Sequence, residues 1–146
     1  MLNIENIKRT AKAQWNGNLK EGKGALTTPS GILTNTNYSF KTRFTGEETG
    51  TNPEELLAAA HAGCFTMAVS AALTQSGLTD IVLNTEATVS MEGLSIKSVH
   101  LAISATVEGI TAAEFEAITK EAEQTCLISK VLNIPISSEA NFIAKP

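Results

Sequence analysis

The sequence predicts a single α+β domain over residues 1–146, with its elements in the order β-β-β-α-β-β-α-β. Two observations favour this class. Segments with alternating apolar residues are grouped and joined by short turns, and two helix-like segments separate the groups. At 146 residues and 42% hydrophobic content, the chain is long enough for one core but short for two. We therefore expect antiparallel sheets around a buried central helix.

The first part of the chain, residues 7–44, is expected to form three strands joined by turns rich in Gly and Asn, which tolerate the backbone of tight connections. In the third strand, residues 37–44, aromatic residues alternate with polar ones. Because successive side chains of a strand point to opposite faces, this alternation predicts that Arg43 faces away from the aromatic rings.

The segment Asn52-Pro53-Glu54-Glu55 predicts the start of the central helix, because it combines a capping side chain, a Pro at the first helical position and acidic residues. The helix should end near Gly77. Residues 56–73 carry no charge and approach the length of a membrane span, but polar residues such as His61 interrupt them and no similar stretch exists. We expect a buried helix and no membrane as partner.

A helix that is apolar on every side cannot be covered by one small sheet. We therefore expect a second copy of the chain to cover the rest of residues 56–73, which predicts a homodimer.

The second part of the chain is expected to form a hairpin from residues 81–91 and 99–107, with Gly93 in its turn, because alternate residues of both segments are apolar. Residues 134–143 should form the last strand. Pro135 favours a position at the edge of a sheet or in a bulge.

Two cysteines fall on the two predicted helices. Cys64 lies in the uncharged helix, and Cys126 lies near the end of a second helix that opens with the capping-box sequence Thr111-Ala112-Ala113-Glu114. If these helices pack together, the cysteines can approach to the Cα separation of roughly 5.5 Å that a disulfide requires. Cys64, oxidised to a sulfenic acid, would then be attacked by Cys126. Inert packing of both thiols in the core is the alternative.

A reactive Cys64 needs a cation nearby, because the thiolate is the attacking species and burial disfavours it. Arg43 is one of only two arginines and lies on the predicted strand that directly precedes the central helix. A carboxylate at the helix start would hold its guanidinium in bidentate geometry. The residues do not decide whether Glu54 or Glu55 supplies that carboxylate.

Two rival functions follow from other readings of the same residues. His61 and Cys64 share a helix face and, with Cys126 and His100, offer zinc-type ligands for a hydrolase. No C-x-x-C or H-E-x-x-H motif supports that hypothesis, so no metal is expected. The second rival is a dimeric binding protein for a hydrophobic small molecule, whose thiols are incidental.

Charge and the first residues narrow the partners and the location. The formal net charge is −4, and the 11 Lys and Arg residues are spread along the chain, so nucleic acid is not an expected partner. Residues 1–6 lack the basic start and apolar stretch of an export signal, so the cytoplasm is the expected location.

A specific block, residues 50–65 with the sequence GTNPEELLAAAHAGCF, resembles the osmotically inducible protein C (OsmC) family. The similarity extends to residues 13–17 and to Cys126 and Ser129, so it covers essentially the whole chain. The related organic hydroperoxide resistance (Ohr) branch shares the plan. Features such as His61 look more like the OsmC branch.

The resemblance implies a cysteine-based peroxidase that reduces organic hydroperoxides to alcohols in oxidative and osmotic stress defence. The family forms intertwined homodimers and needs no haem, flavin or metal cofactor. Matched residue by residue, Cys64 is the peroxidatic cysteine, Cys126 the resolving cysteine, Arg43 the arginine that activates the thiolate and Glu54 the acid that orients it.

Apolar walls are expected from Phe44, Phe65 and Met67, which would favour alkyl hydroperoxides over hydrogen peroxide. An external dithiol must reopen the disulfide, and the resemblance points to a lipoyl protein or a thioredoxin-like donor. One residue departs from the family, which usually has Pro after the resolving cysteine where this chain has Leu127. Loss of that Pro is expected to shift the helix end and to slow disulfide formation.

Overall fold

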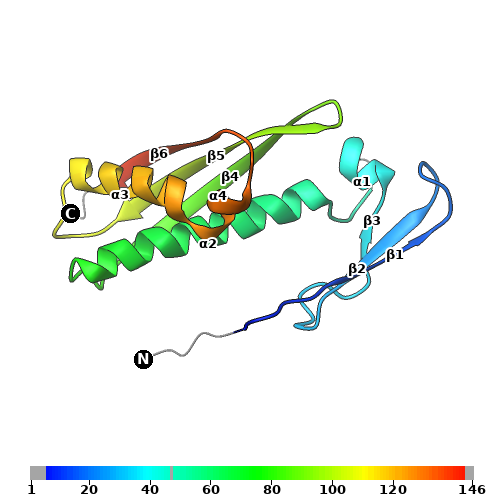
Figure 1. Cartoon of the computed structure of the whole chain (residues 1–146), viewed down its shortest axis with the longest axis horizontal. Coiled ribbons are helices and arrows are strands. Elements are labelled where there is room, and N and C mark those ends of the chain that lie inside the picture. The colour runs from blue at the N-terminus through cyan, green and yellow to red at the C-terminus, as the bar shows by residue number, and fades with distance from the viewer. Residues whose placement is uncertain (1–5, 47, 144–146) are drawn as a thin grey trace. The chain divides into compact units, whose positions relative to one another are not determined.

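The fold is described from a computed structural model that covers residues 6–46 and 48–143 (Figure 1). The chain divides into two compact units, Met1–Glu54 and Glu55–Pro146. Each unit holds one three-stranded sheet, which confirms the α+β class. Residues 1–5, on which the expectation about export rests, lie outside the described residues.

The first unit contains the three strands that the sequence predicts. They are β1 (Lys12–Asn16), β2 (Lys23–Thr27) and β3 (Thr36–Tyr38), paired antiparallel in sequence order. The rings of Trp15 and Tyr38 lie 5.6 Å apart across β2. Between them is Gly24, where any side chain would collide with the Tyr38 ring. The absence of a side chain at Gly24 therefore allows the two aromatic rings to lie on either side of this residue.

The prediction that the third strand continues to residue 44 is wrong, because helix α1 (Phe40–Phe44) follows β3. Ser39 caps this helix: its Oγ accepts a hydrogen bond of 3.2 Å from the Thr42 backbone N–H, and Thr42 Oγ1 accepts one of 2.7 Å from the Ser39 N–H. This capping box satisfies buried backbone groups that the alternating pattern leaves out of account.

The predicted orientation of Arg43 is therefore also wrong. Because Arg43 lies on α1 rather than on a strand, its guanidinium is 5.2 Å from the centre of the Phe44 ring instead of on the opposite face from the aromatic residues. Phe40 packs against the same ring at 5.0 Å.

The second unit contains the predicted hairpin, formed by β4 (Val82–Glu92) and β5 (Ser95–Thr106) with Gly93 at a φ of 61° in the turn. The last strand, β6 (Ile136–Ile143), lies at the sheet edge as predicted, directly after Pro135. It pairs with β5 in parallel, whereas only antiparallel sheets were expected. The helical connection between β5 and β6 returns the chain in the same direction, which permits parallel pairing.

The long helix α2 (Pro53–Gln75) has the predicted bounds, and α3 (Ala112–Thr125) begins after the predicted capping box at Thr111. A short helix that the sequence did not predict, α4 (Leu127–Val131), follows directly. Cys126 lies between the two helices, with extended backbone, so α3 ends here although Leu127 replaces the family's Pro.

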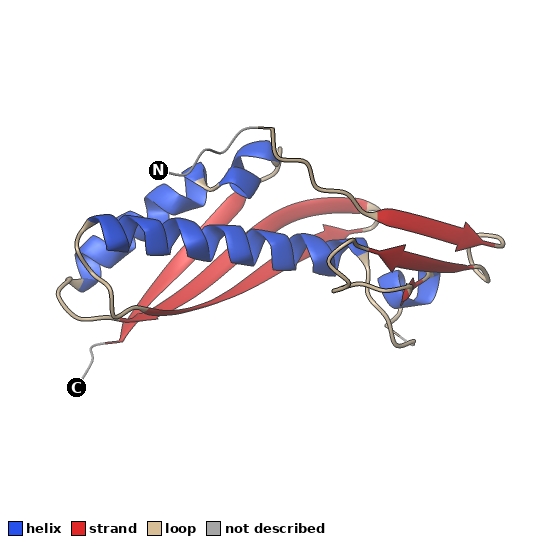
Figure 2. Cartoon of the chain, turned by 90° about the horizontal axis from the view of Figure 1, so that it is seen from below, coloured by secondary structure: helices blue, strands red, loops and turns tan. Residues whose placement is uncertain are grey.

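Helices α2 and α3 lie across one face of the β4–β5–β6 sheet (Figures 1 and 2). One residue per turn of α2 is buried in this core: His61, Phe65, Val69 and Leu73. The helix is long and apolar enough by length and composition to cross a membrane, and its buried stripe packs into the core of the second unit. The other side of α2 is exposed within the second unit, with Met67 76% accessible.

Candidate active site

In the first unit, Arg43 and Glu54 form a bidentate ion pair. Arg43 Nε donates to Glu54 Oε1 at 2.9 Å and to Oε2 at 3.3 Å, and Nη2 donates to Oε1 at 2.7 Å. Glu54 is buried and Arg43 is partly exposed. The carboxylate therefore fixes the direction of a guanidinium that keeps donors for a further ligand. The structure pairs Arg43 with Glu54, which answers the choice between Glu54 and Glu55 that the sequence left open.

The start of α2 is tied to α1, which fixes the geometry of this pair. Asn52 Nδ2 donates to the Thr42 carbonyl at 3.2 Å, and the Thr51 N–H donates to the Asn37 carbonyl at 2.9 Å. The sequence motif at the start of the helix therefore contributes to holding Glu54 against Arg43.

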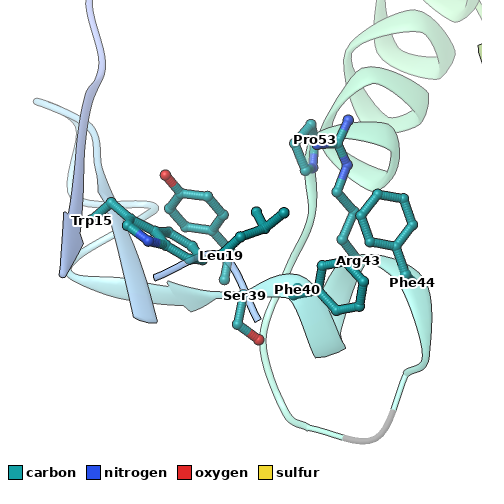
Figure 3. A pocket seen from close by; sticks show the side chains of 8 residues that line it. Trp15, Leu19, Ser39, Phe40, Arg43, Phe44 and Pro53 are labelled. Carbon is teal, nitrogen blue, oxygen red and sulfur yellow. The ribbon is translucent and has the colours of Figure 1, made fainter. Parts of the chain in front are cut away.

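A small cavity of about 200 Å³ lies beside Arg43. Figure 3 shows Phe40, Arg43 and Phe44 on one side of it and Trp15 and Leu19 on the other. Its lining is mostly aromatic and apolar, with one cation: Trp15, Leu19, Tyr38, Ser39, Phe40, Arg43, Phe44 and Pro53. Such a lining suits a ligand with an apolar body and one polar or anionic end. Phe44 is thus brought together with Arg43.

In the second unit, both cysteines line a separate cavity of about 400 Å³. Neither is in a disulfide; Cys64 is partly accessible and Cys126 is buried. The other lining residues are Met67, Ala68, Thr125 and Leu127. The fold therefore brings the two predicted thiols and Met67 to one apolar cavity, although the thiols are far apart in the sequence.

Behind this cavity, a chain of polar atoms runs from Cys126 to α2. Cys126 Sγ lies 3.0 Å from Ser129 Oγ, and Ser129 Oγ lies 2.8 Å from His61 Nε2. All three side chains are buried. Burial lowers the pKa of His61, so its imidazole is neutral near pH 7. All three residues stand out in the sequence, but their connection is not predicted from it. The spacing of Cys126 and Ser129, which lets the thiol cap α4, is the signal that the sequence carries.

Two other predicted residues, Phe65 and His100, lie away from the thiol cavity. Phe65 is fully buried in the hydrophobic core and does not line the cavity that contains Cys64. His100 lies on the outer face of the sheet, where Nδ1 is 2.7 Å from Ser137 Oγ and Nε2 is 3.2 Å from Glu139 Oε1. Within residues 6–46 and 48–143, no three His, Cys, Asp or Glu side chains are grouped as metal ligands.

Comparison with known proteins identifies the family to which the chain is similar. Residues 46–140 match the family described as OsmC-like protein. The chain is 42% identical over 135 residues to the protein named peroxiredoxin OsmC of Escherichia coli strain K12, covering 90% of this chain and 94% of that protein. Peroxiredoxin OsmC of Shigella flexneri matches with the same identity and coverage.

Solved structures share the fold. The organic hydroperoxide resistance protein OhrB of Bacillus subtilis aligns with a TM-score of 0.64 at 22% identity, covering 92% of this chain and 98% of that one. The organic hydroperoxide resistance protein OsmC of Legionella pneumophila aligns with a TM-score of 0.60 at 23% identity, covering 94% and 98%. At these identities the structures establish the fold alone.

Proposed function

Because the chain belongs to the OsmC-like protein family, we propose that it is a thiol-dependent peroxidase that reduces organic hydroperoxides to alcohols. One observation carries the proposal: two free thiols from distant parts of the chain line one apolar cavity. Its relatives named peroxiredoxin OsmC share 42% of the aligned residues, which supports the same chemistry here.

In the proposed reaction, the Cys64 thiolate attacks the terminal oxygen of the hydroperoxide and the O–O bond breaks. Cys64 becomes a sulfenic acid, and the alkoxide takes a proton and leaves as the alcohol. Cys126 then attacks the sulfur of the sulfenic acid, which forms a disulfide and releases water. An external dithiol, a lipoyl protein or a thioredoxin-like donor, reduces the disulfide. No metal, flavin or haem takes part.

Arg43 is proposed to stabilise the Cys64 thiolate and the charge that develops on the leaving oxygen. Its bidentate contact with Glu54 supports this role, because a fixed guanidinium loses little freedom when it binds a charged oxygen. We propose that Phe44 and Met67, which line the two cavities, supply apolar surface for the alkyl part of the substrate, whereas Phe65 is buried in the core.

We also propose that the two units act as one OsmC-like domain and that the active form is an intertwined, cytoplasmic homodimer. The apolar residues on the exposed side of α2, such as Met67, support the dimer because a soluble protein rarely leaves such a surface uncovered. Either subunit is then able to supply Arg43 to a given Cys64.

Consumption of cumene hydroperoxide with dihydrolipoamide as reductant tests the proposed function. The wild-type protein is expected to consume the peroxide catalytically. Cys64→Ser should reduce the rate to that of the uncatalysed reaction, and Cys126→Ser should allow oxidation of Cys64 without a disulfide. Equal consumption by the wild-type protein and by a variant without both cysteines would favour a ligand-binding protein with incidental thiols.

A further inference from the structure

The polar chain behind the thiol cavity links Cys126 to a buried imidazole. Ser129 Oγ lies between Cys126 Sγ, at 3.0 Å, and His61 Nε2, at 2.8 Å. The Ser129 backbone N–H also donates to Cys126 Sγ at 3.4 Å. His61 is 0%, Cys126 3% and Ser129 7% exposed, so bulk water does not reach this chain of atoms.

The backbone holds Cys126 in a fixed orientation. Its N–H donates to the Ala122 carbonyl at the end of α3, and its carbonyl accepts from the Lys130 N–H in α4. Because both helices hold the residue while its side chain lines the cavity shared with Cys64, one side of the sulfur is directed to the cavity and the other to Ser129.

We propose that Ser129 and His61 form a proton relay that removes the thiol proton of Cys126 when this residue attacks oxidised Cys64. The proposal rests on the proposed peroxidase function. Ser129 contacts the reacting sulfur, and His61 acts through Ser129 as a positioning and proton-holding residue. The relay gives a buried thiol a route to the thiolate that attack requires.

The step balances as follows. The Cys126 proton passes to Ser129 Oγ while the Ser129 hydroxyl proton passes to His61 Nε2. The Cys126 sulfur forms a bond to the Cys64 sulfur, and the S–O bond of the sulfenic acid breaks. The departing hydroxide takes a proton at the partly accessible Cys64 side of the cavity and leaves as water, and His61 returns its extra proton through Ser129 to the Cys126 sulfur when the external dithiol reduces the disulfide. Closure of the disulfide requires no oxidant or reductant beyond the peroxide.

The state of His61 suits this role. Burial lowers its pKa, so the ring is neutral and able to accept a proton near pH 7. The titratable groups near it are Cys126, reached through Ser129, and Cys64, one turn further along α2; burial is the sole cause of the shift among the described residues. His61 Nδ1 is buried without a hydrogen-bond partner in the part of the chain described, so the only protein contact recorded for the ring nitrogens leads to Ser129.

Rapid-quench mass spectrometry separates the two oxidation steps and tests the relay. After one equivalent of cumene hydroperoxide, Ser129→Ala and His61→Gln should form the Cys64 sulfenic acid at the wild-type rate. Both should close the disulfide about 10²-fold more slowly near pH 7, the usual worth of general acid–base catalysis. The deficit should shrink as the pH rises, because hydroxide then ionises Cys126 directly. Ser129→Thr, which keeps the hydroxyl, should recover most of the closure rate.

Disulfide closure at the wild-type rate in both variants would overturn the relay. A closure rate that is reduced by the same factor at every pH would also overturn it, because such a loss indicates that the two residues have only a structural role. If the wild-type protein forms no sulfenic acid, the proposed function fails. A second experiment, which does not depend on peroxidase activity, then tests the relay. In a Cys64→Ser background, His61→Gln should move the pH dependence of Cys126 modification by methyl methanethiosulfonate to higher pH. An unchanged profile would contradict it.

Discussion

At the scale of single residues, the ion pair of Arg43 and Glu54 determines how a cation is presented. Three contacts between 2.7 and 3.3 Å hold the guanidinium, and the buried position of Glu54 limits the competition from water. Loss of the carboxylate would remove this anchor and leave the guanidinium beside the Phe44 ring, 5.2 Å from its centre. Glu54 therefore contributes by fixing the position of the Arg43 guanidinium, in addition to balancing its charge.

Glu54→Gln tests this assignment. The amide keeps the size of the side chain but loses the charge and the bidentate acceptor, so oxidation of Cys64 should slow by about 10²-fold, the cost of a misplaced catalytic group. The measurement is the second-order rate of sulfenic acid formation with cumene hydroperoxide. Glu55→Gln, the matched control at the exposed neighbouring acid, should react like the wild-type protein. Equal effects of both substitutions would contradict a specific role for Glu54.

At the scale of elements, a buried polar cluster joins α3 to β6. Ser138 Oγ donates to Glu123 Oε1 at 2.7 Å, and Lys120 Nζ donates to the Ser138 carbonyl at 2.6 Å. Burial alone would raise the pKa of Glu123, but the hydrogen bonds, that from Ser138 foremost, and the Lys120 charge together lower it below its ordinary value. The cluster positions α3, and with it Cys126 at the end of that helix.

Ser138→Ala should lower the free energy of unfolding by about 1–3 kcal/mol, because it removes one of the hydrogen-bond donors of a buried carboxylate. Since the pKa of Glu123 is lower in the folded than in the unfolded protein, its contribution to stability is present above its ordinary pKa of 4.5 and is lost as the pH falls through the folded pKa. Urea unfolding at pH 7 and in the acid range measures both effects. Ser137→Ala on the outer face is the control, and an equal loss there would contradict the account.

Strong local signals made most elements predictable from the sequence. The capping box at Thr111 is predictable because its side chains satisfy backbone groups nearby in the chain, and the start of α2 is predictable because Pro53 favours the first helical position. The same chemistry at Ser39 was missed, because alternating aromatic residues imitate a strand over the short length of α1. Helix α4 was missed because a thiol caps it, and cysteine is not a usual capping residue.

The candidate site was predictable as a set of residues but not as an arrangement. Glu54 and Glu55 are equivalent in the sequence, and only three-dimensional geometry selects one of them as the partner of Arg43. The link from Cys126 through Ser129 to His61 joins residues that are far apart in the chain, so no local pattern encodes it. The parallel pairing of β6 is likewise a long-range property.

At the scale of the whole molecule, the exposed side of α2 connects the fold to assembly. Between residues 59 and 71, the exposed positions of this helix carry small or apolar residues: Ala59, Ala60, Gly63, Met67 and Ala71. Small side chains permit close packing of another element, and a large apolar side chain such as Met67 gains by being covered. This surface is the proposed dimer contact.

Ala71→Glu should convert the proposed dimer to a monomer at micromolar concentration, because it places an unpaired charge in an apolar interface. Ala71 is exposed within the second unit and is not among the residues lining the thiol cavity, so folding of that unit should persist. Sedimentation velocity gives the oligomeric state and circular dichroism the fold. Thr88→Glu on the outer face of β4 should remain dimeric, and an Ala71→Glu dimer would exclude this surface as the interface.

The most direct test of the central claim is the intact mass of the denatured protein after one equivalent of tert-butyl hydroperoxide. The account predicts rapid loss of two hydrogens, with peptide mapping that assigns the change to a bond between Cys64 and Cys126 and with no change in Cys64→Ser. Wild-type protein that keeps its full mass and both free thiols after the same exposure would contradict a peroxidase based on these cysteines.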